Sequence, residues 1–103
     1  MSISDTMRKI RTRKGIPVAF GSFREKQAPP YIVYRGGGQT NLPADDTFYH
    51  SEPDYQIEYY FREKNEEQET AIEQILLEDG WLYEKSSDIY IEDEKLWAIY
   101  YQV

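Results

Sequence analysis

The sequence contains no cysteine and only one histidine, His50, among its 103 residues. Without cysteine there is no disulfide framework, no thiolate nucleophile and no Cys-based zinc or iron–sulfur site. A Ser/His triad would have to be built around His50, and a zinc ion would need mostly carboxylate ligands. These absences favour a protein that is not an enzyme and that carries no catalytic residues, metal or cofactor.

Long hydrophobic runs are also missing from the sequence. No stretch approaches the roughly 20 apolar residues that a membrane helix needs. The basic residues near the N-terminus are not followed by the apolar segment of a secretory signal. We therefore expect no membrane association and a location in the cytoplasm of the producing cell.

Basic residues are scarce, with 12 Lys and Arg against 19 Asp and Glu, which gives a formal charge of −7. Such a chain is a poor partner for nucleic acid, because neutralising phosphates requires a basic surface. The charge is unevenly spread: residues 1–14 carry a net +4, residues 15–64 a net −2 and residues 65–103 a net −9. A basic head and an acidic tail fit head-to-tail self-association or a charged partner, although two solvated faces would explain the same distribution.

The length fits one domain spanning residues 1–103. The spacing of Ile3, Met7 and Ile10, with Ser4 available as an N-cap, predicts a short helix over 4–14. A second helix is predicted over residues 66–79, capped by Asn65 and ended by Gly80, because an apolar stripe recurs at helical spacing.

Strand signals fill most of the remaining sequence. The clearest is the alternation of apolar and polar side chains over residues 55–62, which requires one face to be core. Strand material also occurs at Trp81 to Tyr83. The other predicted strands cover residues 17–20, 31–35 and 47–50, and a terminal hairpin covers 88–103. This order predicts an α+β fold in two layers, with a mostly antiparallel sheet of four to five strands packed against two helices.

A polar loop is predicted to begin at the triple glycine Gly36, Gly37 and Gly38 and to run beyond Asp46. The glycines do not form a phosphate-binding loop, because no Gly-Lys-Ser/Thr and no helix start follow them. Such a loop fits a segment that orders against a partner, although it could equally be flexible without one.

Asp45 and Asp46 could join His50 and Glu52 around a divalent cation. Their spacing is not diagnostic, since neighbouring strand residues point to opposite faces and solvated turn carboxylates explain the same residues. A metal-dependent hydrolase using Asp45, Asp46 and His50 is therefore a minor hypothesis.

The ten tyrosines exceed what one small core can bury with every hydroxyl satisfied. Tyr60 lies opposite the inward face of its predicted strand, and Tyr100 and Tyr101 cannot both point into one core. Tyrosine is also enriched in protein contact patches. The candidate interface residues are Gly36, Gly37, Gly38, Asn41, Asp45, Asp46, Tyr60 and Tyr101.

The succession of these elements resembles the tail-completion, or head-to-tail joining, proteins of long-tailed bacteriophages and prophages. The resemblance covers the chain from about residue 16 onward. It is carried by the Pro29 to Tyr34 strand entry, the polar loop, the Tyr55 to Phe61 strand, a helix rich in Glu and Gln, and a hairpin ending in Leu96 to Tyr101.

The resemblance implies a structural α+β subunit that assembles into rings, often hexameric, at the head–tail junction of the virion. It implies contacts with other copies, with the connector and with the tail tube, and DNA would pass only as cargo through the ring. The loop of residues 36–47, the N-terminal helix and the sheet edges would be contact regions. The rival hypothesis is a stand-alone acidic binding module, an inhibitor or nucleic-acid mimic acting on a basic host protein.

Overall fold

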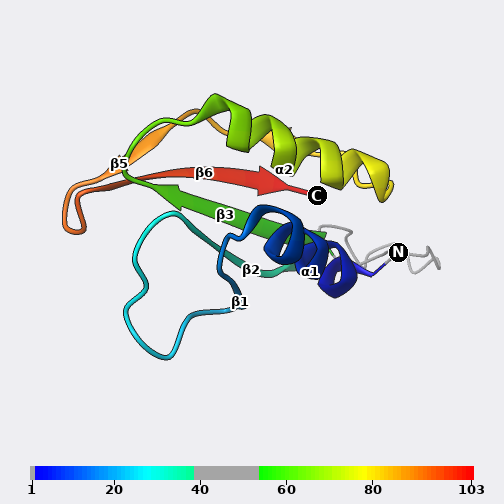
Figure 1. The fold of residues 1–103 in the computed structure, drawn as a ribbon, viewed down its shortest axis with the longest axis horizontal. Helices are drawn as coiled ribbons and strands as arrows, with labels where there is room; N and C mark the ends of the chain where they lie inside the picture. The colour runs from blue at the N-terminus through cyan, green and yellow to red at the C-terminus, as the bar shows by residue number, and fades with distance from the viewer. Residues whose placement is uncertain (1, 39–53) are drawn as a thin grey trace, which may run out of the picture.

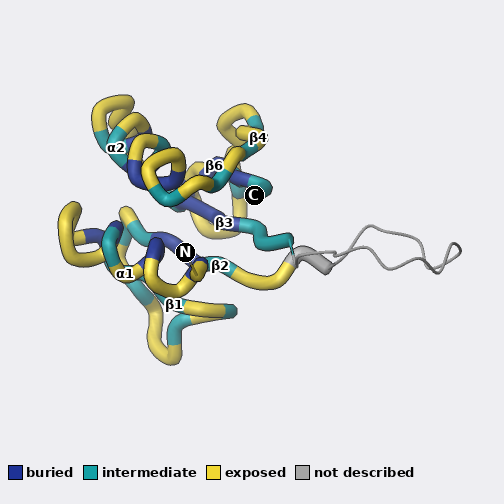
Figure 2. Tube along the Cα trace, turned by 90° about the vertical axis from the view of Figure 1, so that its right-hand side faces the viewer, coloured by how far each residue is buried: buried dark blue, intermediate teal, exposed yellow. Residues whose placement is uncertain are grey.

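The computed structural model describes residues 2–38 and 54–103. The elements in this part of the chain are α1 (Ile3–Lys14), β1 (Val18–Phe20), β2 (Tyr31–Gly38), β3 (Asp54–Phe61), α2 (Glu66–Glu78), β4 (Glu84–Lys85), β5 (Ile89–Ile91) and β6 (Leu96–Gln102). The strands form one sheet in the order β1-β2-β3-β6-β4, and β5 also pairs with β6 (Figure 1). Both helices lie on the same side of the sheet (Figure 2).

The predicted α+β fold in two layers is confirmed. Every strand pair is antiparallel except β1 with β2, which run parallel. The sheet has six strands in the described residues, where four to five were predicted; β5 and β6 form the predicted terminal hairpin, and the two-residue strand β4 was not predicted.

Several predicted boundaries are wrong in detail. Ser2, not Ser4, caps α1, and its side chain accepts a hydrogen bond from the Asp5 amide. Trp81 to Tyr83 is not a strand, and the pairing begins only at Glu84, next to Gln102 of β6. The predicted strand over residues 47–50 lies outside the described residues.

The helix ends follow local chemistry that the sequence does predict. Gly15 ends α1 at φ 68°, in the left-handed region that glycine adopts without steric cost. The Asn65 side chain accepts a hydrogen bond from the Gln68 amide at 3.1 Å and so caps α2. Gly80, at φ 88°, follows the end of α2 as expected.

The core lies between the sheet and the two helices. Alternate side chains of β2, β3 and β6 point into it, which agrees with the period of two along a strand. The core cluster consists of Ile3, Met7, Ile10, Ile16, Ile32, Ile57, Tyr59, Phe61, Ile72, Ile75, Leu76, Ile99 and Tyr101. The other face of the sheet carries no helix in the described part of the chain, and we call it the open face (Figure 2).

A polar network joins the two helices where α2 ends. The Asp79 carboxylate is almost completely buried and accepts hydrogen bonds from Lys9 and from the Thr6 hydroxyl, the latter at 2.6 Å. The Thr6 oxygen in turn accepts a hydrogen bond from the Trp81 indole N–H at 3.0 Å. The bond from Lys9, followed by that from Thr6, lowers the pKa of Asp79 below its ordinary value of 3.8.

The lowered pKa predicts a loss of stability in acid. The ionised Asp79 carboxylate stabilises the folded state above the unfolded pKa of 3.8, and this contribution disappears as the pH falls through the lower folded value. Urea unfolding at pH 7 and at pH 3 should therefore give a lower free energy of unfolding in acid. Asp79→Asn should reduce that difference, whereas Asp5→Asn, at an exposed position of α1, should preserve it. An unchanged pH dependence in Asp79→Asn would contradict this account.

Candidate interaction surfaces

The open face of the sheet carries a pair of stacked tyrosines on neighbouring strands. Tyr31 of β2 lies directly opposite Tyr60 of β3, and their ring centroids are 5.0 Å apart at an angle of 27°. Phe23, from the loop that follows β1, meets the edge of the Tyr31 ring at 5.5 Å. Three aromatic rings thus lie in contact on a face that no helix covers among the described residues.

A buried carboxylate lies beside these rings. Glu58 occupies the position opposite Val33 on the same face, and its side chain is 8% exposed. Its Oε1 accepts hydrogen bonds from the Tyr60 hydroxyl at 2.8 Å and from Arg35 Nη2 at 3.3 Å. Its Oε2 lies 3.2 Å from Arg35 Nε and accepts a hydrogen bond from Gln56 Nε2 at 3.0 Å.

These partners give Glu58 a structural role. A carboxylate has about four acceptor positions, and the surrounding donors occupy them. Burial, followed by the hydrogen bond to Glu58, raises the pKa of Tyr60, so the phenol stays protonated as the donor. Arg35 Nη2 also donates to the Gly21 carbonyl at 3.2 Å, which ties the loop after β1 to the sheet. Glu58 therefore offers no free oxygen for proton transfer or for a ligand.

Replacing Arg35 by methionine is expected to lower the free energy of unfolding by about 2 kcal/mol, because the buried Glu58 carboxylate loses its charged partner. Arg24→Met, at an exposed site on the loop after β1, should leave the stability within about 0.5 kcal/mol of wild type. Adding Glu58→Gln to Arg35→Met should recover part of the loss. Equal stability of Arg35→Met and wild type in urea would show that Glu58 does not need this partner.

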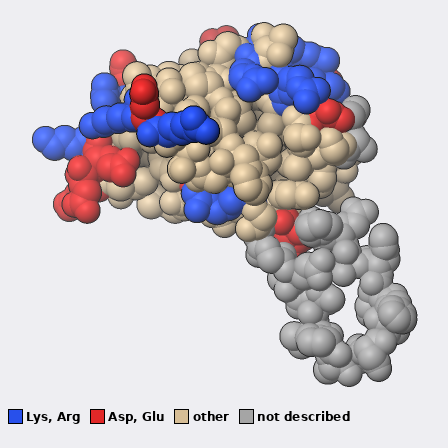
Figure 3. Space-filling view, turned by 90° about the horizontal axis from the view of Figure 1, so that it is seen from below, with Lys and Arg blue, Asp and Glu red and all other residues tan. Residues whose placement is uncertain are grey.

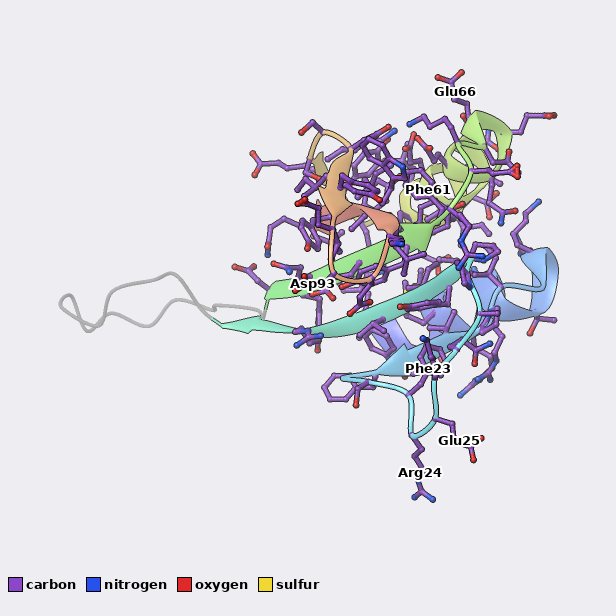
Figure 4. The ribbon with its side chains drawn as sticks, turned by 90° about the vertical axis from the view of Figure 1, so that its left-hand side faces the viewer. Phe23, Arg24, Glu25, Phe61, Glu66 and Asp93 are labelled. Atoms are coloured by element: carbon purple, nitrogen blue, oxygen red, sulfur yellow. The ribbon has the colours of Figure 1, made fainter. Side chains whose placement is uncertain are left out.

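A groove of about 480 Å³ runs over this face. The loop of residues 21–29 forms one wall, and the turn that contains Asp93 forms another (Figure 4). Arg24 and Glu25, at the tip of the loop, project away from the sheet (Figure 4). The charged lining residues are Arg24, Glu25, Lys26, Arg35, Glu58, Arg62, Asp93, Glu94 and Lys95. A floor of aromatic rings with a rim of both charges is typical of a protein contact rather than of an anion or cation site.

A second hollow, of about 840 Å³, lies between Pro29, Pro30 and the first turn of α2. Its inner surface includes Tyr59 and Phe61 of the core cluster. Side chains of both charges surround it, among them Lys64 and Glu66. It is a wide surface depression, and we assign it no chemistry.

Seven of the eight predicted interface residues fall into three groups. Gly36, Gly37 and Gly38 do not begin a loop but complete β2, and the register with β3 shifts between Gly36, opposite Tyr55, and Gly38. Tyr60 lies on the open face and is half-buried, as the alternation along its strand predicts. Asn41, Asp45 and Asp46 lie outside the described residues, as does His50 of the hydrolase hypothesis.

The choice of Tyr101 as a candidate interface residue is wrong. Tyr101 is fully buried in the core, and its hydroxyl donates to Glu73 Oε2 at 2.7 Å. Burial, followed by this bond to the carboxylate, raises its pKa. Its neighbour Tyr100 points to the open face, opposite Glu58. Of the two tyrosines that could not share one core, Tyr100 is therefore the one nearer the surface.

The two ends of the sheet carry exposed aromatic side chains that were not among the predicted interface residues. At one end β1 exposes 63% of Phe20, and at the other end Tyr90 and Trp97 are 47% and 37% exposed, with their rings 5.0 Å apart. No described strand pairs with the outer side of β1 or of β5. Phe20 and Tyr90 are large apolar side chains on three-residue strands, and this combination is the signal that could have identified these ends.

The two ends also differ in charge. Helix α1, which contacts β1, carries five basic residues and one acidic residue. Arg8 and Arg11 line a small hollow with Phe20 at the β1 edge. Basic side chains gather at the upper right of Figure 3, over this helix. Residues 84–95, at the other end, carry five acidic and two basic side chains, a net −3. One end of the sheet is therefore basic and the other acidic.

Comparison with known proteins gives no assignment: no protein-family model matches the sequence, and a search of curated proteins finds no match. In the described residues, no group of three or more His, Asp or Glu side chains is placed to hold a metal ion. None of the described helices is both long and apolar enough to span a membrane.

Proposed function

We propose that this protein is a structural subunit of bacteriophage or prophage morphogenesis, of the tail-completion or head–tail joining type. It assembles as a ring-like homo-oligomer at the head–tail junction and contacts the connector and tail tube proteins there. It assembles in the bacterial cytoplasm, acts without catalysis or cofactor, and meets DNA only as passing cargo.

One observation carries this proposal, and it concerns the outer edges of the strands β1 and β5. Both β1 and β5 present exposed aromatic rings beside an outer edge that has no partner strand in residues 2–38 and 54–103. Natural proteins usually cover such edges or mark them with charge, since an open apolar edge invites another strand. Two unlike open edges on one subunit fit an assembly in which each copy contacts two neighbours.

The order of the elements also supports the proposal. The segments that carry the resemblance to tail-completion proteins form the corresponding elements: Tyr31 to Tyr34 lies in β2, Tyr55 to Phe61 in β3, and Leu96 to Tyr101 in β6. A helix rich in Glu and Gln, α2, separates β3 from the terminal hairpin. The order is thus the one that the resemblance implies.

Electron microscopy of the purified protein at high concentration tests the proposal. We expect closed rings with a central opening, which bind the connector or tail tube protein encoded beside this chain. A protein that forms no ring, binds neither neighbour and instead binds one basic host protein tightly would overturn the proposal. That result would favour the acidic binding module, which the net −9 of residues 65–103 also fits.

A further inference from the structure

The outer edge of β1 offers a defined set of backbone groups. The Ile32 amide donates to the Pro17 carbonyl at 2.9 Å and the Gly21 amide donates to the Tyr34 carbonyl at 2.8 Å, so β1 faces β2 through alternate residues. Val18 and Phe20, between them, therefore direct their backbone groups outward. The Phe20 carbonyl already accepts from the Ser22 amide at 2.9 Å. Within residues 2–38 and 54–103, no backbone partner is found for the Val18 amide or carbonyl, so Val18 is the residue of β1 that offers both groups.

The outer edge of β5 offers one matching residue. Val103 exchanges backbone hydrogen bonds with Tyr55 of β3, so alternate residues of β6, beginning with Gln102, face the opposite side. Ala98 is among these and lies opposite Ile89. Ile89 therefore directs its backbone groups toward β6, and Tyr90 directs its amide and carbonyl outward.

We propose that β5 of one copy of this chain adds to β1 of the next copy as an antiparallel strand, with Tyr90 opposite Val18. The two residues would exchange both backbone hydrogen bonds, and the sheet would continue from one subunit into the next. This inference rests on the proposed function only in its claim of self-association, and it specifies the contact.

The side chains of Val18 and Tyr90 lie on the same face of the sheet, as this backbone pairing requires. Directly opposite residues of an antiparallel pair share a face of the sheet. Val18 packs against the core between sheet and helices, and Tyr90 lies opposite Trp97, which pairs with the core residue Phe61. Both thus lie on the helix-covered face, and apolar surface of Val18 would meet the ring of Tyr90.

Charge favours the pairing of β5 with β1 over the pairing of either strand with its own copy. In this register Asp88 comes opposite Phe20, whose hollow Arg8 and Arg11 also line. Pairing β1 with β1 would instead bring two copies of the basic helix together. An antiparallel β5–β5 pair centred on Tyr90 would instead place Glu92 of each copy opposite Asp88 of the other. Like charges placed side by side repel, whereas the unlike pairing sets a net +4 helix beside a net −3 segment.

The contact is heterologous, so each subunit keeps one open edge after binding a neighbour. Repetition of the same contact closes into a ring when the rotation between subunits allows it. Repeated pairing of β5 with β1 would therefore build the ring-like assembly from single subunits.

Cysteine pairing tests the register, because the native chain contains no cysteine. With Tyr90 opposite Val18, Ile89 comes opposite Ala19 at a position without interstrand hydrogen bonds, where the Cα atoms lie about 4.5 Å apart. That spacing allows a disulfide. An equimolar mixture of Ala19→Cys and tagged Ile89→Cys full-length protein, oxidised mildly, should give a mixed disulfide dimer as its major product.

Matched variants make the result specific. Ala19→Cys mixed with Ile91→Cys, two residues out of register, should cross-link less, and Thr70→Cys, at an exposed position of α2, should serve as the collision background. Circular dichroism checks that each variant folds. A disulfide dimer of Ala19→Cys with itself, exceeding that background, would overturn the unlike pairing.

The outcome separates this inference from the proposed function. If wild type forms rings but the Ala19→Cys and Ile89→Cys mixture cross-links no faster than the Thr70→Cys background, the pairing of β5 with β1 is wrong while the ring proposal stands. If wild type forms no rings and binds neither neighbour but the mixture still cross-links specifically, the pairing holds and the proposed function fails.

Discussion

Replacing Leu76 by alanine is expected to lower the free energy of unfolding by about 3 kcal/mol. Leu76 lies in α2, is fully buried and belongs to the core cluster beneath the sheet. Shortening its side chain removes apolar contacts and leaves a cavity that the surrounding core fills only in part. Urea unfolding followed by circular dichroism measures the change.

Leu77→Ala provides the matched control. Leu77 is the next residue of the same helix, is 51% exposed and carries the same side chain. Its replacement should change the free energy of unfolding by less than about 0.5 kcal/mol. Similar costs for the two variants would show that α2 does not pack on the sheet through the face that contains Leu76.

Replacing Thr6 by valine is expected to lower the free energy of unfolding by about 2 kcal/mol. Valine keeps the shape of threonine but removes the hydroxyl that donates to Asp79 and accepts from the Trp81 indole N–H. Thr6 is fully buried, so both partners lose a hydrogen bond in a place that water does not readily reach. Urea unfolding of the variant measures the cost.

Thr12→Val, at an exposed position of the same helix, is the control and should be close to neutral. A second measurement separates loss of the network from a general weakening. The indole N–H resonance of Trp81 should shift in Thr6→Val, while that of Trp97, at the other end of the sheet, should not. An unchanged Trp81 resonance would contradict the proposed network.

Local patterns predict most of the fold because they act within a few residues. The apolar spacing in α1 and α2, the cap at Asn65 and the alternation along β3 each depend on neighbours in the chain, and each is present in the structure. The two-residue strand β4 was missed because its pairing is set by β6, which is distant in sequence, and not by any local strand signal.

The faces of β6 could not be predicted from sequence for a related reason. Leu96 to Tyr101 is an uninterrupted apolar run, so no alternation shows which side chains face the core. The register with β3 decides it, because Tyr101 lies opposite Ile57 and Tyr100 lies opposite Glu58. The contacts of Glu58 with Arg35 could not be predicted from the sequence either, because they depend on the pairing of β3 with β2.

The uneven charge of the head and tail segments is a property of the sequence itself, but the positions of these segments at the two ends of the sheet follow only from the topology. The sheet order places α1 and β1 at one end and the acidic segment of residues 84–95 at the other. Opposite charge thus coincides with the two open edges. This coincidence turns a compositional asymmetry into a specific hypothesis of self-association.

Sedimentation equilibrium of the wild-type protein over a wide concentration range measures whether the chain self-associates. We expect the average mass to rise with concentration toward a single multiple of the chain mass, and to fall again when Val18→Pro removes the outward amide of β1. A mass equal to that of one chain at every concentration would contradict this expectation.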